Sequence, residues 1–339
     1  MSSAVAALCI VLGAAVVVLV AWDVVSTTLT LGEGAGPLTR RVLSSGWRQL
    51  MRLHRGRADG RASLLTAGGP VLMVTTVVLW VGAFWTGWSL VFVGSGSVVE
   101  FSSGRSASVA DVFYYAGFAV SSLGVGDFVS TVPGWRVATA VASFSGLALL
   151  TLSITYLFSV MSAVVTRRAL ATQLHALGGS AQDLLLGSWD GDRFDPVLTQ
   201  QLLALPGQLA TVAEQHLAYP VLHFFRSRRA EAEAPLAIAR LDDAALLLRF
   251  AVAEHVRPPG PAVDQVRRVV DRYLATATAG HDGPAEEEEP PPPPEVGRLA
   301  AAGMPLADAG SWRCAVEEAA PRRVRLRRLV EDAGWDWEA

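Results

Sequence analysis

The sequence predicts an all-α membrane protein with three transmembrane helices, a re-entrant helical segment before the third of them, and a helical cytoplasmic domain. Hydrophobic residues make up 51% of the 339 residues and charged residues only 17%. The apolar excess lies almost wholly before residue 167, whereas most of the charge lies after it. A short apolar stretch with a glycine-rich end also separates the second and third long apolar runs.

Three apolar runs reach the length of about 20 residues that crosses a bilayer. The first is Ala4–Val20, which continues to Asp23 within an N-terminal segment of residues 1–32. The second is Gly69–Val93, and the third is Val137–Val165, which ends at two arginines. A cleaved signal peptide is the alternative for the first run, but no basic residue precedes it. We therefore expect a retained transmembrane helix.

Basic residues predict the orientation of these spans. Residues 33–67 contain seven arginines against two acids, whereas residues 94–110 contain one of each. The positive-inside rule makes 33–67 a cytoplasmic loop, with the N-terminus outside and the C-terminus inside a multi-pass protein of the plasma membrane. Asp23 falls at the inner end of the first span, where an interfacial acid is favoured over a gating charge. An interfacial aromatic belt is indicated by Trp80, Trp85 and Trp88.

Between the second and third spans lies a segment that predicts a pore. Ser108–Ser122 is apolar and aromatic but too short to span, and Gly124–Asp127 follows at once. Non-helical backbone at membrane depth survives only where it lines water or protein, which argues against an ordinary glycine turn. A dehydrating cation needs oxygens in place of its water shell, and rings of carbonyls from four chains can supply them. Gly124 and Gly126 permit the left-handed backbone that aims successive carbonyls inward.

The predicted ion-binding residues form one continuous stretch: Ser122, Leu123, Gly124, Val125 and Gly126. Ser122 adds a hydroxyl at the inner end of this stretch. Asp127 adds negative charge at the outer mouth, where it attracts cations. The short helix before the stretch points its negative C-terminal end toward the cavity below the filter.

This segment resembles the pore of the two-transmembrane potassium channel superfamily, whose filter signature is T-V-G-Y-G-D. The matching residues are Ser122–Asp127, SLGVGD, and the resemblance covers about residues 68–166. The family commonly carries paired aromatics in the pore helix, matched by Tyr114 and Tyr115, and a hinge glycine in the inner helix, matched by Gly146. The resemblance implies a homotetramer that conducts potassium passively, with potassium in the filter and no further metal or cofactor.

Two departures from the signature leave ion selectivity open. Val125 replaces an aromatic residue that braces the family's filter by a hydrogen bond, so Tyr115 needs another partner. Ser122 replaces threonine and lacks its methyl group. Selectivity depends on ligand number and filter stiffness, so a weakly selective cation channel is an alternative. For Gly146, close helix packing through small residues is as compatible with the sequence as a hinge.

Several other functions lack their sequence patterns. The spans carry no arginine ladder, so voltage sensing by charge movement is not expected. No G-x-G-x-x-G follows a strand pattern after residue 167, and no nucleophile–base pair or metal-ligand spacing is evident, so we expect neither a Rossmann domain nor an enzyme. Cys9 and Cys314 lie in an apolar run and a polar tail and indicate no disulfide framework.

Residues 167–280 are expected to form a helical cytoplasmic domain. Helical spacing of apolar residues is clear in Ala262–Thr276: Val263, Val266, Val270, Tyr273 and Leu274. His216 and His223 could serve a pH-dependent or metal-binding role, but burial is favoured because no further ligands accompany them. Three acids between residues 190 and 195 lack the spacing of a calcium loop and predict a helix-entry loop: Asp190, Asp192 and Asp195.

The last two segments are an acidic, proline-rich linker over 281–297 and a helical tail over 298–339. The linker contains Glu286–Glu289 followed by five prolines, and the tail carries five clustered arginines: Arg322, Arg323, Arg325, Arg327 and Arg328. These arginines are expected either to meet anionic lipid or to pair with acids such as those of the linker. The expected partners are further copies of the chain, membrane lipid, and an unknown cytoplasmic ligand or protein, but no nucleic acid. A non-conducting, membrane-anchored helical interaction protein remains the alternative from another class.

Overall fold

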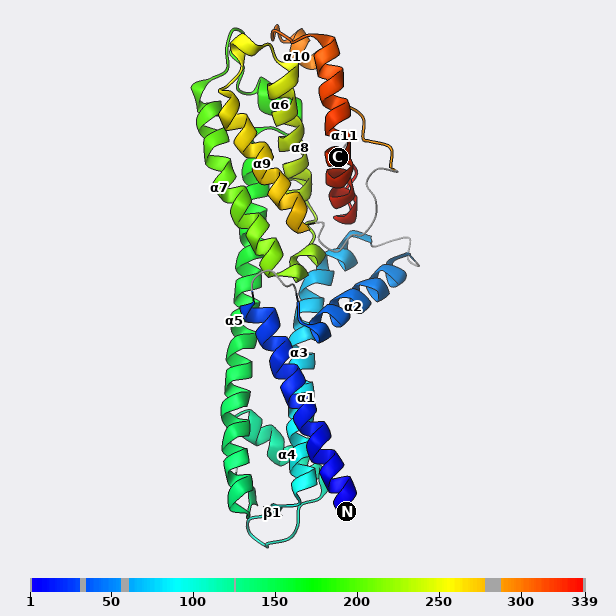
Figure 1. Cartoon of the computed structure of the whole chain (residues 1–339), viewed down its shortest axis with the longest axis vertical. Coiled ribbons are helices and arrows are strands. Elements are labelled where there is room, and N and C mark those ends of the chain that lie inside the picture. Colours follow the sequence, from blue (N-terminus) through cyan, green and yellow to red (C-terminus); the bar gives the residue numbers. More distant parts are fainter. Residues whose placement is uncertain (1, 31–34, 56–60, 125, 278–287, 338–339) are drawn as a thin grey trace. The chain divides into compact units, whose positions relative to one another are not determined.

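The computed structural model describes residues 2–30, 35–55, 61–124, 126–277 and 288–337, with the backbone alone for 50–55 and 61–65. The chain divides into two compact units. The first unit comprises Met1–Gly56 and Pro70–Val160, and the second comprises Arg57–Gly69 and Met161–Ala339. Helices form most of both units (Figure 1).

The first five helices contain the predicted membrane spans: α1 (Ser3–Leu29), α2 (Pro37–Arg55), α3 (Arg61–Ser95), α4 (Val109–Val120) and α5 (Pro133–Leu177). Three of the described helices are long and apolar enough to cross a membrane: α1, the Thr66–Ser95 part of α3, and α5. The three predicted spans are therefore confirmed as helices. The predicted boundary at residue 167 falls inside α5, since this helix runs without a break to Leu177.

Glycines let α1 and α3 pack with their backbones in close contact. A Cβ atom on Gly13 would lie 2.5 Å from the carbonyl oxygen of Gly87, and one on Gly94 would lie 2.6 Å from that of Ala6. Early residues of α1 thus meet late residues of α3, which makes the two helices antiparallel. Small residues that bring backbones together are typical of helix pairs in membranes.

Asp23 joins α1, α2 and α3, and its side chain is fully buried. Its carboxylate accepts hydrogen bonds from the backbone N–H of Leu38 at 2.7 Å, from the Thr39 hydroxyl at 2.6 Å and from the Trp80 indole at 2.8 Å. Asp23 therefore caps the N-terminus of α2, where unpaired N–H groups favour a carboxylate. The structure adds the partners of Asp23, because the neighbouring helices supply the hydrogen bonds that water would otherwise supply; its position at the membrane interface stays a prediction.

The structure adds detail to two further expectations for this region. The segment 33–67 is not simply a loop, since it contains α2 and the first residues of α3. Two of the three tryptophans are buried, Trp80 at 2% exposed and Trp88 at 9% exposed. Trp85 is 40% exposed, and its indole donates to the Phe113 carbonyl oxygen at 2.9 Å. The indole N–H of Trp80 donates to Asp23, and the rings of Trp80 and Trp88 pack inside the unit.

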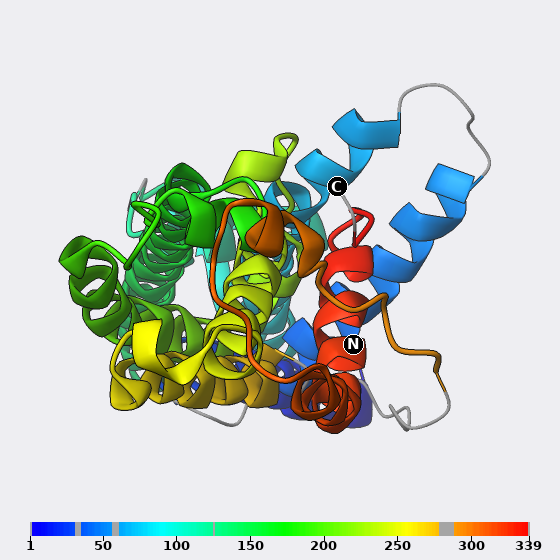
Figure 2. The same cartoon turned by 90° about the horizontal axis from the view of Figure 1, so that it is seen from above.

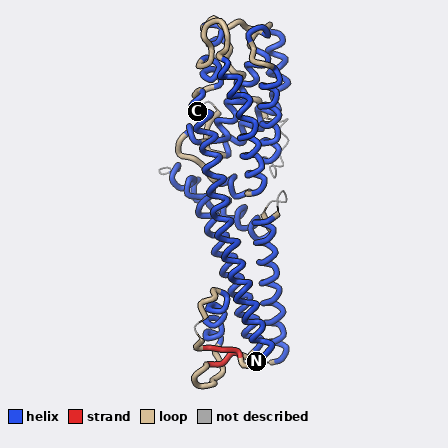
Figure 3. The backbone as a smooth tube through the Cα atoms, turned by 90° about the vertical axis from the view of Figure 1, so that its left-hand side faces the viewer, coloured by secondary structure: helices blue, strands red, loops and turns tan. Residues whose placement is uncertain are grey.

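Two short strands flank α4 and pair with each other. β1 (Val98–Glu100) and β2 (Phe128–Ser130) are antiparallel, with Val99 opposite Val129. Figure 3 shows this pair at the same end of the first unit as the N-terminus of α1. The strands tie the residues after α3 to the residues after the glycine-rich segment. The sequence analysis did not predict them, because three residues are too few to show an alternating pattern.

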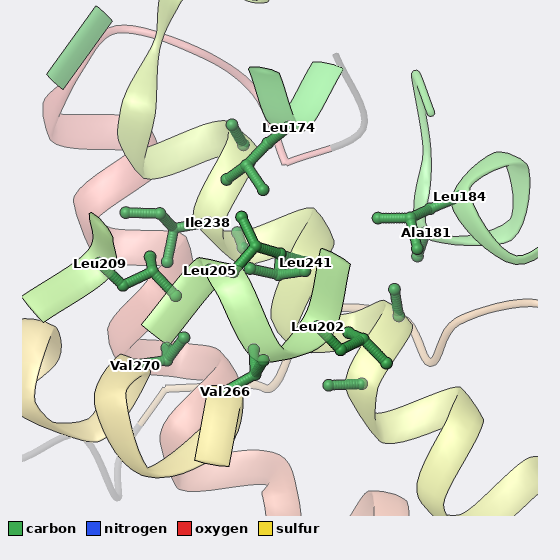
Figure 4. Close-up of a cluster of buried hydrophobic side chains, with 14 of the residues drawn as sticks. Leu174, Ala181, Leu184, Leu202, Leu205, Leu209, Ile238, Leu241, Val266 and Val270 are labelled. Carbon is green, nitrogen blue, oxygen red and sulfur yellow. The ribbon is translucent and has the colours of Figure 1, made fainter. Parts of the chain in front are cut away.

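The second unit is a helical domain, as expected. Its remaining elements are α6 (Ala181–Leu186), α7 (Pro196–Ala218), η1 (Pro220–Phe224), η2 (Ala230–Ala232), α8 (Ala234–Leu246), η3 (Leu247–Ala251), η4 (Glu254–Val256), α9 (Gly260–Ala277), α10 (Gly297–Ala301) and α11 (Ala309–Asp332). Helix α9 lies alongside α7 (Figures 1 and 2). Figure 4 shows the core between them, with Leu205 and Leu209 of α7 near Ile238 of α8 and Val270 of α9.

The positions of side chains in this domain test the predictions for α9, for His216 and for the acids between residues 190 and 195. The periodic apolar residues of α9 are buried, and His216 is 8% exposed, so the burial interpretation of that histidine is confirmed. The acids between α6 and α7 form a helix-entry loop, in which Asp195 caps α7 by accepting from the Val197 N–H at 2.8 Å. Asp190 accepts from two backbone N–H groups of the same loop.

The arginines of α11 pair with acids. Arg323 contacts Asp243 through two bonds of 2.8 and 3.0 Å, and Arg322 contacts Asp242 at 2.6 Å. Arg328 lies 3.0 Å from Glu288, so the acid-pairing alternative holds for this residue, while Glu286 and Glu287 lie outside the described residues. The guanidinium of Arg323 also donates to the carbonyl oxygens of Pro291 and Pro292. These bonds hold the start of the proline segment against α11.

Candidate functional site

The glycine-rich segment begins where α4 ends, and α4 has a well-defined start. Ser108 and Asp111 form a capping box: the Ser108 hydroxyl accepts from the Asp111 N–H at 3.3 Å, and the Asp111 carboxylate accepts from the Ser108 N–H at 2.9 Å. This reciprocal pairing satisfies two N–H groups that a helix start leaves without partners. At the other end, the Ser121 hydroxyl donates to the Gly117 carbonyl oxygen at 2.7 Å.

Left-handed backbone alternates along the segment after α4. Ser122 has φ of 60°, Gly124 of 60° and Gly126 of 80°. Glycine adopts such angles readily, whereas a residue with a Cβ atom pays a steric penalty. The left-handed backbone expected at the two glycines is thus present, and Ser122 shares it. Val125 lies outside the described residues.

The hydroxyl of Ser122 is directed to the third span. Its oxygen lies 3.1 Å from the Ser143 hydroxyl of α5 and 3.4 Å from the Ser143 carbonyl oxygen. These contacts accompany the unusual backbone angle of Ser122 and connect the inner end of the segment to α5. The adjacent Leu123 is 71% exposed, so its side chain has little contact within this single chain.

Asp127 is held from two directions at the outer end of the segment. The Tyr114 hydroxyl donates to its carboxylate at 3.3 Å, and the Phe101 N–H donates to its carbonyl oxygen at 2.8 Å. Phe101 directly follows β1 and Phe128 begins β2, so the strand pair places Asp127. In the loop after β1, hydrogen bonds from Ser103 and Arg105 hold the pKa of Glu100 below its usual range.

Tyr115, the second aromatic of the predicted pair, points to α5. Its hydroxyl lies 2.5 Å from that of Thr139, and its ring meets Phe92 of α3 edge-on at a centroid distance of 5.1 Å. Tyr115 is 8% exposed. The expectation that Tyr115 needs a partner outside the filter is therefore confirmed, and the partner is Thr139.

A cavity of about 90 Å³ lies between the aromatic pair and the glycine-rich segment. Its walls include Tyr114, Tyr115, Gly124, Gly126 and Asp127. The volume exceeds that of one or two water molecules, so the segment is not packed tightly against α4 in a single chain. The site thus consists of a supported backbone segment with open space behind it.

Gly146 is a close-packing residue. A Cβ atom there would lie 2.0 Å from the carbonyl oxygen of Val120, the last residue of α4, and α5 continues through Gly146 without interruption. These contacts therefore support close packing as the role of Gly146, and the hinge interpretation stays a prediction. The backbone at the end of α4 occupies the place where a side chain at position 146 of α5 would lie. Only glycine therefore fits at this position.

The structure brings together all described residues of the predicted site and adds three that the sequence analysis missed. Thr139, Ser143 and Val120 support Tyr115, Ser122 and Gly146, respectively. Thr139, Ser143 and Gly146 fall on one stretch of α5 with spacings of four and three, which place residues on one helix face. That spacing was the signal available in the sequence. Among the described residues, no cluster of three His, Cys, Asp or Glu side chains is arranged to hold a metal ion.

Comparison with known proteins yields one informative relative. The chain is 30% identical over 316 residues to the "Uncharacterized membrane protein YdjJ" of Bacillus subtilis (strain 168). The aligned region covers 93% of this chain and 91% of that protein. No protein-family model matches the chain, and no solved structure matches it. The similarity therefore extends over both units and is not limited to the glycine-rich segment.

Proposed function

The chain belongs to the family of the membrane protein YdjJ, and we propose, from the geometry of its glycine-rich segment, that it is the subunit of a homotetrameric channel that conducts potassium passively across the plasma membrane. The observation that carries this proposal is the left-handed backbone at Ser122, Gly124 and Gly126, between a short apolar helix and an acid. Such a segment can present successive carbonyl oxygens to a cation that has lost its water.

Conduction requires four copies, since one chain supplies a quarter of each oxygen ring. In each copy, α4 directs about half a negative charge from its C-terminal end toward the inner side of the filter. Asp127 attracts cations at the outer end. Tyr114 and the strand pair restrain the outer end of the segment, and Tyr115 ties α4 to α5 beside it. Stiffness of the filter favours one ion over another.

The proposed orientation places the N-terminus and the strand pair outside and the helical domain in the cytoplasm. The arginine excess of residues 33–67 supports this orientation. Helix α5 links the filter region to the helical domain as one helix of 45 residues. The helical domain is therefore proposed to bias conduction through α5, with a cytoplasmic ligand or protein as the stimulus.

A weakly selective cation channel is the second candidate, and a specific observation favours it. Val125 stands where the potassium channel signature has an aromatic hydrogen-bond donor. The oxygen ring is then braced by fewer bonds, and a softer ring discriminates less between potassium and sodium. The geometry gives no comparable support to a non-conducting interaction protein, because such a protein has no use for strained backbone at Ser122.

A flux assay with paired glycine variants tests the proposal. The full-length protein is reconstituted in potassium-loaded vesicles, and potassium efflux is measured for the unchanged chain, Gly124→Ala and Gly104→Ala. Both glycines have positive φ and open space around them, but Gly104 lies in the outer loop. We expect efflux to be lost only in Gly124→Ala. Equal efflux from the two variants, or a monomer or dimer as the purified species, would contradict the proposal.

A further inference from the structure

Helix α2 has an amphipathic sequence with a strong basic excess. Its apolar side chains recur at spacings of one to four residues: Leu38, Val42, Leu43 and Trp47. Three of its arginines are exposed: Arg40, Arg41 and Arg48. The helix contains no acidic residue over its whole length, Pro37–Arg55. This combination is typical of helices that lie in the plane of a membrane surface.

The apolar side of α2 is partly covered by the neighbouring span. Leu43 is 4% exposed, and a Cβ atom on Gly46 would lie 2.5 Å from a methyl group of Leu72 in α3. Arg41 and Arg48 are seven residues apart, so they share a side of the helix that is not covered in this way. The contacts of α2 with the spans therefore leave its basic side outermost.

The N-terminus of α2 is fixed in place by Asp23. This carboxylate lies in α1 and binds the N–H groups of Leu38 and Thr39 as well as the indole N–H of Trp80 in α3. Three helices meet at one buried group, so α2 cannot turn its basic side inward without breaking several hydrogen bonds. Figure 1 shows α2 leaving α1 obliquely instead of continuing along it.

Chain connectivity restricts α2 to the membrane surface. Only residues 30–36 separate it from the end of α1, and the apolar part of α3 begins at Thr66. Arginines held at that level face lipid headgroups directly. Arg40 donates to the Ala35 carbonyl oxygen at 3.4 Å and Arg48 to the Ser44 carbonyl oxygen at 3.2 Å, and both side chains remain exposed.

We infer that α2 binds anionic phospholipid headgroups through Arg40, Arg41 and Arg48. Each arginine near an anionic surface strengthens binding by about fivefold at low ionic strength. The orientation in the membrane proposed above places these headgroups in the inner leaflet. The inference depends on α1 and α3 crossing the membrane but not on conduction, so a protein that passes no ions would bind these lipids equally.

Native mass spectrometry of the full-length protein tests this inference. Phosphatidylglycerol, which is anionic, and phosphatidylcholine, which is zwitterionic, are titrated separately, and the first binding constants are compared. The test variant carries Arg40→Gln, Arg41→Gln and Arg48→Gln. The control variant carries Arg193→Gln, Arg268→Gln and Arg313→Gln, which remove three exposed arginines of the second unit. The two variants have the same net charge.

The unchanged protein and the control are expected to prefer phosphatidylglycerol, and the α2 variant is expected to lose that preference by up to about a hundredfold, about fivefold for each of the three arginines. The elution volume and thermal midpoint of each variant show that it is folded. A preference for phosphatidylglycerol that survives in the α2 variant would overturn the inference. So would the absence of any preference in the unchanged protein, or a loss confined to the control variant.

Discussion

The Tyr114 hydroxyl donates a hydrogen bond to the Asp127 carboxylate at 3.3 Å and so connects the middle of α4 to the outer end of the proposed filter. The Tyr114 ring also meets Phe118 and Phe128 edge-on, at centroid distances of 4.4 and 6.1 Å. Asp127 is 13 residues further along the chain. The bond therefore closes the loop that contains the glycines and limits how far its outer end can move.

Removing this bond is expected to weaken ion discrimination. Tyr114→Phe retains the ring but lacks the donor, so the outer end of the filter gains freedom and sodium is excluded less strictly. Because the bond is exposed to solvent, the sodium-to-potassium permeability ratio is expected to rise by less than about tenfold. The permeability ratio from reversal potentials measures the effect.

A double-mutant cycle with Asp127→Asn shows whether the effect comes from the bond itself. If it does, the effect of the double variant on the permeability ratio is smaller than the sum of the two single effects. The expected difference is at least 0.5 kcal/mol, about the lower limit for coupled neighbours. Additive effects of the two substitutions would mean that Tyr114 and Asp127 act separately.

Gly146→Ala is expected to destabilise the protein. The added methyl group would lie 2.0 Å from the Val120 carbonyl oxygen, so α4 and α5 must separate, at a cost of about 1–3 kcal/mol. Gly134→Ala is the matched control, since it lies in the same helix and has nothing within 4 Å. Thermal unfolding of the detergent-solubilised protein distinguishes them. A hinge role alone predicts altered currents with an unchanged thermal midpoint.

Two glycine variants test the contact between α1 and α3, because they are expected to change the free energy of unfolding in opposite directions. Gly13→Ala places a methyl group 2.5 Å from the Gly87 carbonyl oxygen and should lower the free energy of unfolding by about 1–3 kcal/mol. Gly82→Ala, at a helical position with nothing within 4 Å, should raise it by about 0.5–1 kcal/mol, because alanine favours helix. Equal thermal shifts of the two variants would show that α1 is not packed against α3 in this way.

In the helical domain, Asp243→Asn should cost far more stability than an exposed change of the same kind. It leaves the Arg323 guanidinium, 1% exposed at its side chain, without its carboxylate partner, at a cost of about 3–5 kcal/mol. Glu214→Gln breaks the exposed pair with Arg272 and should cost about 0–1 kcal/mol. Chemical unfolding followed by circular dichroism compares the two. Similar midpoints would mean that the Arg323 contact is not maintained in solution.

The extent to which the sequence predicted this structure differs between its parts. Long apolar runs and the periodicity of α9 identified the helices, because burial of one face leaves a regular pattern. The glycines identified positions of positive φ, because few other residues tolerate it. Ser122 was not expected to share that conformation, since its compensating contact to Ser143 comes from a residue 21 positions away.

Asp23 shows why the rest could not be predicted. A single acid near the end of an apolar run carries no information about its partners, and Trp80 is 57 residues away. The burial of Asp23 becomes intelligible only once α1 and α3 are antiparallel and α2 turns away from them. Packing across the chain, and not local pattern, decides whether such a group faces water.

The most direct test of the central claim is the reversal potential of the reconstituted full-length protein, with potassium on one side of a planar bilayer and sodium on the other. We expect a current that reverses far from zero, on the side set by potassium permeation, because backbone carbonyls restrained by Tyr114 and the strand pair favour the larger ion. A current that reverses at zero would contradict potassium selectivity and leave the weakly selective channel. No current from verified tetramers would contradict conduction altogether.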